Sequence, residues 1–315
     1  MISFILVNYN TKQITKQAID SITDSFENLN SYEIIVVDNA STDGSKELFE
    51  NLKIENFHYF YNDENYGFGK ANNIGVENSS GEYIYILNTD TILHTKNIDK
   101  IIKEKFNIYN YLGVLATKVQ YEDGSLQPNV QKFSNLLAIA LRLLKIGQFV
   151  RNSKVLIQFF KILPIKPKMV RSYLENFNKE RGEEFIDWAS GCSLIFKREV
   201  YEKLGGFDDK FFMYTEDEEL CYRVHQLGYS ILYTPDILIT HFEGKSNTNK
   251  KINEFLLKTK IESEFYYYKK HFPDKYGTLK LIYEVVTLFG YPFSKRLRLM
   301  RKYYKELNLW KKYYY

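Results

Sequence analysis

Short apolar runs alternate with amphipathic stretches through the first part of the chain, and this alternation constrains the fold more than any other feature. We expect strands and intervening helices at the following places: strands at 2–7, 33–37, 57–61 and 83–87, and helices at 12–25, 45–52 and 68–77. Successive strands begin about 25 to 30 residues apart, which is the spacing of right-handed βαβ units. The pattern predicts an α/β fold with a mostly parallel, Rossmann-like sheet flanked by helices.

The alternation stops after Tyr121, and the later segments differ in character. Residues 133–165 read as an amphipathic helix in which basic side chains are interspersed among leucines and isoleucines. Further elements are expected in this order: a strand at 186–197, helices at 198–204 and 216–227, and a helical, basic, aromatic segment from 244 onward.

These segments suggest a division into domains. We expect an α/β domain over residues 1–246, which contains a basic helical insert at 131–180, and a helical extension over residues 247–315. The insert and the extension share a basic, aromatic-rich composition, so they are candidates for one surface.

The composition is that of an ordinary globular protein, with 44% hydrophobic and 26% charged residues in a chain of 315. Cys192 and Cys221 both lie in apolar surroundings and cannot build a disulfide framework, so we expect reduced core cysteines in a cytosolic protein. The N-terminal apolar run is too short for a signal peptide, and no run of about 18 apolar residues occurs, so no transmembrane helix is expected.

Charge is segregated along the chain although the net charge is only +4. From Gly244 to the end there are 17 Lys and Arg residues against six Asp and Glu, and residues 131–180 carry ten against two. The remaining residues are therefore strongly acidic. This distribution suggests a site that attracts cations in one part and a surface that meets anions in another.

Polar residues follow each predicted strand, where open α/β sheets place their ligands. The first strand leads into Asn8, Tyr9 and Asn10, and the later ones into VVDNASTDGS, NYGFGKANNIG and LNTDT. Any one of these clusters is also explained as a turn or a helix cap, and for Asp43 that explanation is as good as a functional one. The glycine spacing is not that of a dinucleotide fingerprint, which disfavours NAD.

Six motifs taken together resemble family 2 glycosyltransferases of the GT-A fold, in the branch that includes bacterial rhamnosyltransferases. They are VNYN, VVDNASTDGS, NYGFGKANNIG, LNTDT, the long stretch DWASGCSLIFKREVYEKLGGFDDKFFMYTEDEELCYRVHQLGY, and HFEGKS. The resemblance covers residues 1–246 and implies that this region is the catalytic domain. It implies transfer of a sugar from a nucleotide donor.

The resemblance also implies a nucleotide site. In such enzymes the acid at the place of Asp38 accepts a hydrogen bond from the pyrimidine imide N–H, and a carboxylate suits that donor. Lys70 and the backbone N–H groups near Gly67 and Gly69 are candidates for neutralising the diphosphate at a helix start. The residues expected to bind the nucleotide are Asn8, Tyr9, Asp38, Asn65, Gly67, Lys70 and Asn88.

A metal site is implied by Asn88-Thr89-Asp90, which replaces the family's usual Asp-x-Asp. Only Asp90 can supply a carboxylate, while Asn88 is suited to the ribose or to a metal-bound water. His241 in HFEGKS is the second expected ligand, although a structural histidine is also possible. Imidazole with one carboxylate and phosphate oxygens favours Mn²⁺ somewhat over Mg²⁺.

The acidic run at residues 216–219 opens a predicted helix, where carboxylates are favoured by the helix dipole. The resemblance assigns the catalytic base to Asp217, with its neighbour Glu216 as the alternative. One base suffices for an inverting displacement, which separates this chemistry from that of a retaining glycosidase. Trp188, Gly191 and Glu216 are expected beside the sugar and the acceptor, although ordinary core packing explains Trp188 nearly as well.

The expected activity is inverting, metal-dependent sugar transfer to a glycan or polyprenyl-linked acceptor in the synthesis of a bacterial surface polysaccharide. Branch similarity favours dTDP-rhamnose as the donor; UDP-hexoses or galactofuranose are the alternatives, and a catalytically silent nucleotide-sugar-binding scaffold is the rival of another class. A nucleotidyltransferase would need a basic, glycine-rich loop after the first strand, and VNYNTKQ offers none.

The basic, aromatic segments are typical of a peripheral interaction with an anionic membrane surface, here the inner face of the cell membrane. A solvated helical face with a homodimer contact remains the simpler alternative. Nucleic-acid binding is disfavoured because it would leave the first 246 residues unexplained.

Overall fold

The structure is a computed structural model of the whole chain, and it describes residues 1–144, 180–242, 250–290 and 294–310. Contacts divide the chain into two compact units: unit 1 is Met1–Phe133 with Arg181–Thr248, and unit 2 is Ser134–Glu180 with Asn249–Tyr315. Of the basic segment expected at 131–180, residues 134–144 group with the C-terminal helices, and residues 145–179 lie outside the described residues.

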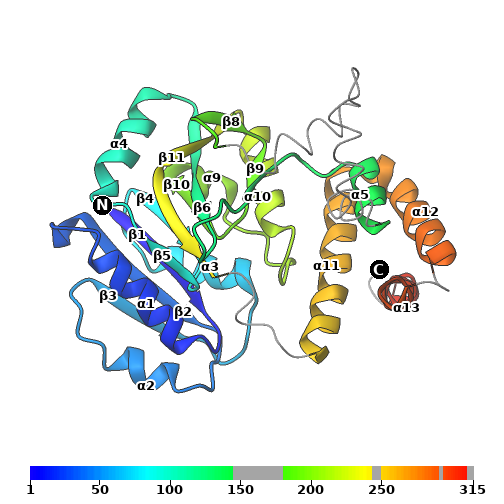
Figure 1. Cartoon of the computed structure of the whole chain (residues 1–315), viewed down its shortest axis with the longest axis horizontal. Helices are drawn as coiled ribbons and strands as arrows, with labels where there is room; N and C mark the ends of the chain where they lie inside the picture. The colour runs from blue at the N-terminus through cyan, green and yellow to red at the C-terminus, as the bar shows by residue number, and fades with distance from the viewer. Residues whose placement is uncertain (145–179, 243–249, 291–293, 311–315) are drawn as a thin grey trace. The chain divides into compact units, whose positions relative to one another are not determined.

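Unit 1 is built on a nine-stranded sheet of order β3-β2-β1-β4-β10-β6-β11-β5, with β8 paired to β11 (Figure 1). The strands are β1 (Ile2–Asn8), β2 (Tyr32–Asp38), β3 (Phe57–Tyr61), β4 (Tyr83–Leu87), β5 (Thr91–Leu93), β6 (Leu112–Gln120), β8 (Glu184–Ile186), β10 (Ser193–Lys197) and β11 (Ser230–His241). The half from β3 to β4 is parallel, and β10 is antiparallel to both β4 and β6. The predicted α/β class with a mostly parallel sheet is confirmed.

Helices cover both faces of this sheet. They are α1 (Lys12–Thr23), α2 (Ser45–Glu50), α3 (Phe68–Glu77), α4 (Ile98–Ile108), α9 (Arg198–Leu204) and α10 (Glu216–Gln226), and a short 3-10 helix spans Leu29–Ser31. Side chains of α1, α2 and α4 pack in one hydrophobic cluster, and those of α3, α9 and α10 pack in the other. The two clusters share the strands between them, because alternate strand residues point to opposite faces.

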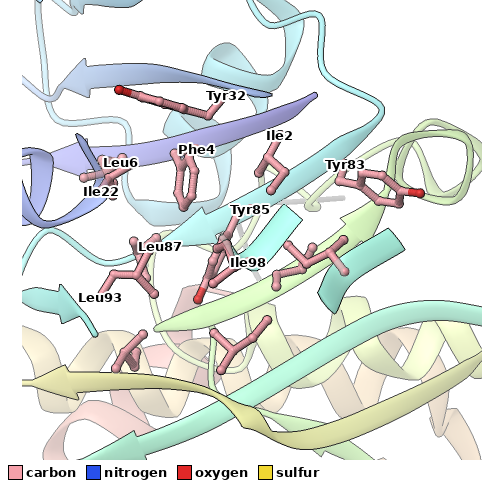
Figure 2. Close-up of a cluster of buried hydrophobic side chains, with 14 of the residues drawn as sticks. Ile2, Phe4, Leu6, Ile22, Tyr32, Tyr83, Tyr85, Leu87, Leu93 and Ile98 are labelled. Atoms are coloured by element: carbon pink, nitrogen blue, oxygen red, sulfur yellow. The ribbon is translucent and has the colours of Figure 1, made fainter. Parts of the chain in front are cut away.

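The first of these clusters lies around β1 and β4, as Figure 2 shows. Phe4 is fully buried, and its ring centroid is 5.0 Å from that of Tyr85 and 6.5 Å from that of Tyr32. The Tyr85 hydroxyl is satisfied at 2.8 Å by the hydroxyl of Ser193. The aromatic richness of the chain is thus used partly to fill this core, which holds the carboxyl ends of the strands in place.

The prediction of a single strand at 186–197 is wrong, because the structure divides this segment among three strands. Ile186 ends β8 against β11, whereas β9 (Trp188–Ala189) pairs with β7 (Val130–Gln131) in a separate two-stranded sheet. A turn through Ser190 and Gly191 then leads into β10. Pairing with three different partners, rather than local propensity, sets these breaks.

Unit 2 consists of helices within the described residues: α5 (Leu136–Leu143), α11 (Lys250–His271), α12 (Pro273–Gly290) and α13 (Lys295–Trp310). They confirm that the segment beyond residue 244 is helical where it is described. The amphipathic helix expected at 133–165 is represented by α5, and the part from residue 145 lies outside the described residues. Among the described helices, none has the length and apolar character that a membrane-spanning segment needs.

Candidate functional site

The loop after β2 is organised by Asp38, whose side chain has no exposed area. Its Oδ2 accepts hydrogen bonds from Asn8 Nδ2 at 2.7 Å and the Tyr59 hydroxyl at 3.0 Å, while its Oδ1 accepts from the Ser41 N–H at 2.7 Å. Asn8 is equally buried and also donates to the Ser41 hydroxyl. Both residues therefore hold the ends of β1 and β2 together in this structure, and a contact of either one with a nucleotide stays a prediction.

The start of α3 packs closely against the backbone at Phe212 and does not form an open phosphate-binding site. Gly67 has a φ of +83°, and a Cβ atom there would lie 2.2 Å from the carbonyl oxygen of Phe212. The N–H of Gly67 donates to Asn65 Oδ1, and the N–H of Phe68 donates to that Phe212 carbonyl. Since both donors are already used within the chain, the expectation that they bind diphosphate is not supported by this geometry.

Three other expected nucleotide ligands lie near the ends of the strands. Tyr9 is half exposed, and Lys70 places its ammonium 4.0 Å from the centroid of the Tyr66 ring. The N–H of Asn88 donates to the carbonyl oxygen of Cys192 at 3.0 Å, which fixes the end of β4 against the start of β10. Only Tyr9 presents a largely exposed side chain here.

Asp90 and His241 come together as predicted, although they lie 151 positions apart in the chain. Their Oδ1 and Nε2 atoms are 3.2 Å apart, and the two side chains are 17% and 11% exposed. On the other side of the ring, Nδ1 lies 3.1 Å from Oε1 of Gln127. When Nδ1 of the neutral ring carries the proton, it donates to this amide oxygen and leaves the lone pair of Nε2 free to bind a cation.

Asp217 lies in the first turn of α10 and is held by two backbone donors. The N–H of Gly191 donates to its Oδ2 at 3.0 Å, and the N–H of Glu218 donates to its Oδ1 at 2.8 Å. Burial, together with the negative charges of Asp90 and Asp217, raises the pKa of the neighbouring Cys192 thiol to about 12. Both carboxylates therefore lie close to Cys192. The two expected metal ligands and the expected base thus share one part of the site.

Glu216 differs sharply from its neighbour. Its side chain is 6% exposed, and Oε2 finds no hydrogen-bond partner in the part of the chain that the structure describes. Burial, together with the charge of Asp217, raises the pKa of Glu216 well above its usual value. The choice of Asp217 over Glu216 as the base stays a prediction.

The backbone before these acids is strained. Tyr214 and Thr215 have φ values of +67° and +69°, a region that residues with a Cβ rarely adopt. Each such residue costs on the order of 1–3 kcal/mol and persists where the surroundings enforce it, most often at functional sites. Here the hydrogen bond from Phe68 to the Phe212 carbonyl anchors the same loop to α3.

Trp188 is placed in the core, so its role as an open platform for a sugar ring is not supported. The side chain is buried, and its indole N–H donates to the carbonyl oxygen of Lys132 at 3.0 Å. Gly191 does lie in the site, since a Cβ atom there would contact Asp217 Cβ at 3.4 Å and the Phe68 ring at 3.2 Å.

A cavity of about 410 Å³ opens beside Asp90 at the N-terminus of α1, with Lys12 and Asp43 on its lining. Asp43 Oδ2 accepts the N–H of Lys12 at 2.8 Å, while its Oδ1 accepts the N–H of Ser45, and these hydrogen bonds lower the pKa of Asp43 against the effect of burial. A helix N-terminus with a lysine suits an anion. Sequence reasoning missed Lys12, although it is the first cation after β1, and it missed Gln127, for which the sequence carries no signal.

The residues present fit a divalent cation. Among the described residues, no three His, Cys, Asp or Glu side chains come together, so Asp90 and His241 would be the protein's share of the ligands. Adjacent ligands of a six-coordinate ion with bonds of about 2.1 Å lie about 3 Å apart, which matches the 3.2 Å observed.

Comparisons with known proteins show the family and the fold of this chain. Residues 3–205 match the family model described as glycosyl transferase family 2. The chain is 24% identical over 224 residues to the N-acetylglucosaminyl-diphospho-decaprenol L-rhamnosyltransferase of Mycobacterium tuberculosis, which covers 68% of this chain and 67% of that protein. It is 24% identical over 266 residues to the rhamnosyltransferase WbbL of Escherichia coli K12, with 78% and 85% covered.

Among solved structures, GalNAc-T7 with UDP, GalNAc and Mn²⁺ superposes with a TM-score of 0.56 at 16% identity. The match covers 85% of this chain and 49% of that one, so this chain spans about half the length of GalNAc-T7. At this identity the likeness shows the fold alone, and it confirms the expected GT-A architecture.

Proposed function

The chain belongs to glycosyl transferase family 2, and from this premise we propose that it transfers a sugar from a nucleoside diphosphate donor to an acceptor hydroxyl with inversion at the anomeric carbon. The observation that carries the proposal is the gathering of Asp90, His241 and Asp217 around Cys192 and Gly191. An inverting displacement of this kind requires ligands for a cation and a positioned base close together.

In the proposed reaction, Asp217 accepts the proton of the acceptor hydroxyl. The acceptor oxygen forms a bond to the anomeric carbon while the bond from that carbon to the diphosphate oxygen breaks. The electron pair of the broken bond leaves with the nucleoside diphosphate. Gly191 and Glu218 hold the Asp217 carboxylate through their N–H groups, which fixes its position for this transfer.

Asp90 and His241 would hold Mn²⁺ or Mg²⁺, and a cation there would supply positive charge to the departing diphosphate. The imidazole ligand favours Mn²⁺. Lys12 and the first N–H groups of α1 line the adjoining cavity and suit the remaining phosphate charge. Gln127 orients His241 so that Nε2 is the coordinating atom.

The names of the relatives support a donor and an acceptor. Two relatives are rhamnosyltransferases, which supports dTDP-rhamnose, while UDP-hexoses or galactofuranose remain the alternatives. The mycobacterial relative is named for a decaprenyl-diphosphate-linked sugar, which supports a glycan or polyprenyl-linked acceptor for a cell-surface polysaccharide. Such an acceptor would place the enzyme on the inner face of the cell membrane, as a monomer or a homodimer.

The test is release of the nucleoside diphosphate from dTDP-, UDP- and GDP-sugars, with polyprenyl-diphosphate-linked N-acetylglucosamine as the acceptor probe. Asp217→Asn should lower the rate by about 10²–10⁴-fold, because the base is lost. A small loss of stability should accompany it, because the amide keeps only one of the two oxygens that accept the Gly191 and Glu218 N–H groups. Asp99→Asn, in the first turn of α4, is the matched control and should retain full activity. An active Asp217→Asn enzyme would remove the base assignment, and a wild type that binds nucleotide without turnover would be a silent binding protein.

A further inference from the structure

Helix α12 exposes an apolar stripe that nothing in the catalytic proposal uses. Its members are Leu281, Val285, Leu288 and Phe289, which are between 42% and 73% exposed. Their spacing of four, three and one residues places them on one side of an α-helix. Leucine and phenylalanine side chains gathered in this way mark a surface that meets an apolar partner.

The rotation of α12 is fixed by contacts on its opposite side. The Tyr283 hydroxyl donates to Glu264 on α11 at 3.1 Å, and the ring centroids of Tyr283 and Phe265 are 4.9 Å apart. Phe265 also contacts the ring of Tyr304 on α13, with the centroids 5.6 Å apart. These aromatic rings form the centre of the three-helix packing, so the apolar stripe faces outward from it.

Helix α13 carries a basic stripe on its own outer side. The exposed cations Lys295, Arg298, Lys302 and Lys305 are spaced by three, four and three residues, which again defines one side of a helix. Within the described residues, none of the four makes an ion pair.

The other charged residues of α13 point toward its neighbours and set its rotation. Arg301 pairs with Glu284 on α12 at 3.0 Å, and Glu306 lies 3.9 Å from Lys258 on α11. The helix thus directs its acid inward and presents only cations outward. Because α12 and α13 pack around the same aromatic centre, each stripe lies on the side of the α12–α13 hairpin that faces away from that centre.

We propose that the outer surface of the α12–α13 hairpin docks onto an anionic lipid bilayer. The apolar stripe would enter the boundary between head groups and acyl chains, and the basic stripe would lie at the anionic head groups. Exposed cations beside an exposed apolar stripe match an anionic membrane, because its head groups are negatively charged and its interior is apolar. The inference depends on the proposed function in one respect: membrane docking would hold the chain beside a lipid-linked acceptor.

Co-sedimentation of the full chain with phosphatidylcholine vesicles, with and without phosphatidylglycerol, tests this surface. Binding should require phosphatidylglycerol. The triple variant Arg298→Gln, Lys302→Gln, Lys305→Gln should bind about 100-fold more weakly, since each cation near an anionic surface contributes about fivefold. The double variant Leu288→Ser, Phe289→Ser should lose at least about tenfold.

The matched controls lie on α4 of unit 1, where Lys100 and Lys103 are also exposed. Lys100→Gln with Lys103→Gln should bind like the wild type, and circular dichroism should show that every variant keeps its helices. Equal binding by all variants, or no binding by the wild type, would overturn the proposal. A second result would also overturn it: light scattering without lipid that shows a dimer for the wild type and a monomer for Phe289→Ser. The apolar stripe would then be a contact between two copies of the chain. Binding of dTDP with Mn²⁺ in the same variants separates this outcome from failure of the catalytic proposal.

Discussion

Substitution of Gly67 by alanine should destabilise unit 1, because it displaces the loop that leads to Asp217. A Cβ atom at this position would lie 2.2 Å from the Phe212 carbonyl oxygen and 2.9 Å from the carbonyl carbon. These are backbone atoms, so they cannot rotate away as a flexible side chain would. The segment that leads to Asp217 must therefore shift by about 1 Å to reach an ordinary contact distance.

The magnitude has two parts. The backbone of Gly67, with φ +83° and ψ −177°, lies in a region that is essentially restricted to glycine, at a cost of about 1–3 kcal/mol for alanine. The shift also breaks the hydrogen bond from the Phe68 N–H to the Phe212 carbonyl, worth about 0.5–1.5 kcal/mol. We expect a loss of about 2–4 kcal/mol, or roughly 5–15 °C in the thermal midpoint of a unit of this size.

Urea denaturation followed by circular dichroism measures this loss. Gly124→Ala is the control, because Gly124 has a similar φ of +78° but nothing lies within 4 Å of its missing Cβ. Gly124→Ala should therefore show the backbone strain alone, about 1–2 kcal/mol. If Gly67→Ala costs no more than Gly124→Ala, the close approach to Phe212 does not constrain the loop and the reasoning is refuted.

Three further outcomes are expected. The raised pKa of Glu216 means that the folded protein keeps a proton which the unfolded chain releases above about pH 4.5, so this group lowers stability as the pH rises. In urea titrations above pH 4.5, the stability of Glu216→Gln should therefore fall less steeply with pH than that of the wild type, by up to about 1.4 kcal/mol per pH unit; an unchanged slope would contradict the assignment. Arg223→Ala should cost about 3–5 kcal/mol in the same assay, because it leaves the fully buried Glu219 without its partner 2.8 Å away, and a loss below 1 kcal/mol would refute this. Gln127→Leu should weaken Mn²⁺ binding by about 10–100-fold in calorimetry by releasing His241, and wild-type affinity would argue against that orientation.

The parallel half of the sheet could be predicted because its signal is local. Three elements begin and end at the predicted residues: the strands at 57–61 and 83–87 and the helix at 68–77. In each case an apolar run ends in a polar cluster, and alternation alone locates such elements. The meeting of Asp90 and His241 was also within reach, because the family resemblance supplied what sequence distance hides.

The remainder depends on contacts between distant residues. The interruption of 186–197 follows from pairing with β11, β7 and β4, and no local property of IDWASGCSLIFK records those partners. Gln127 takes its place opposite His241 only through the path of the chain after β6. Burial of Trp188 and the outward rotation of α12 are likewise decided by tertiary packing, which a single sequence does not show.

Binding of a nucleoside diphosphate, measured by calorimetry with dTDP, UDP and GDP in the presence and absence of Mn²⁺, tests the central claim most directly. One of the three should bind in a Mn²⁺-dependent manner, and Asp90→Ala should abolish that dependence, because Asp90 and His241 supply the cation site. At about 100 times its dissociation constant, the bound nucleotide should stabilise the protein by about 2.7 kcal/mol. Absence of binding by all three nucleotides, or equal binding by Asp90→Ala, would contradict the assignment of this site.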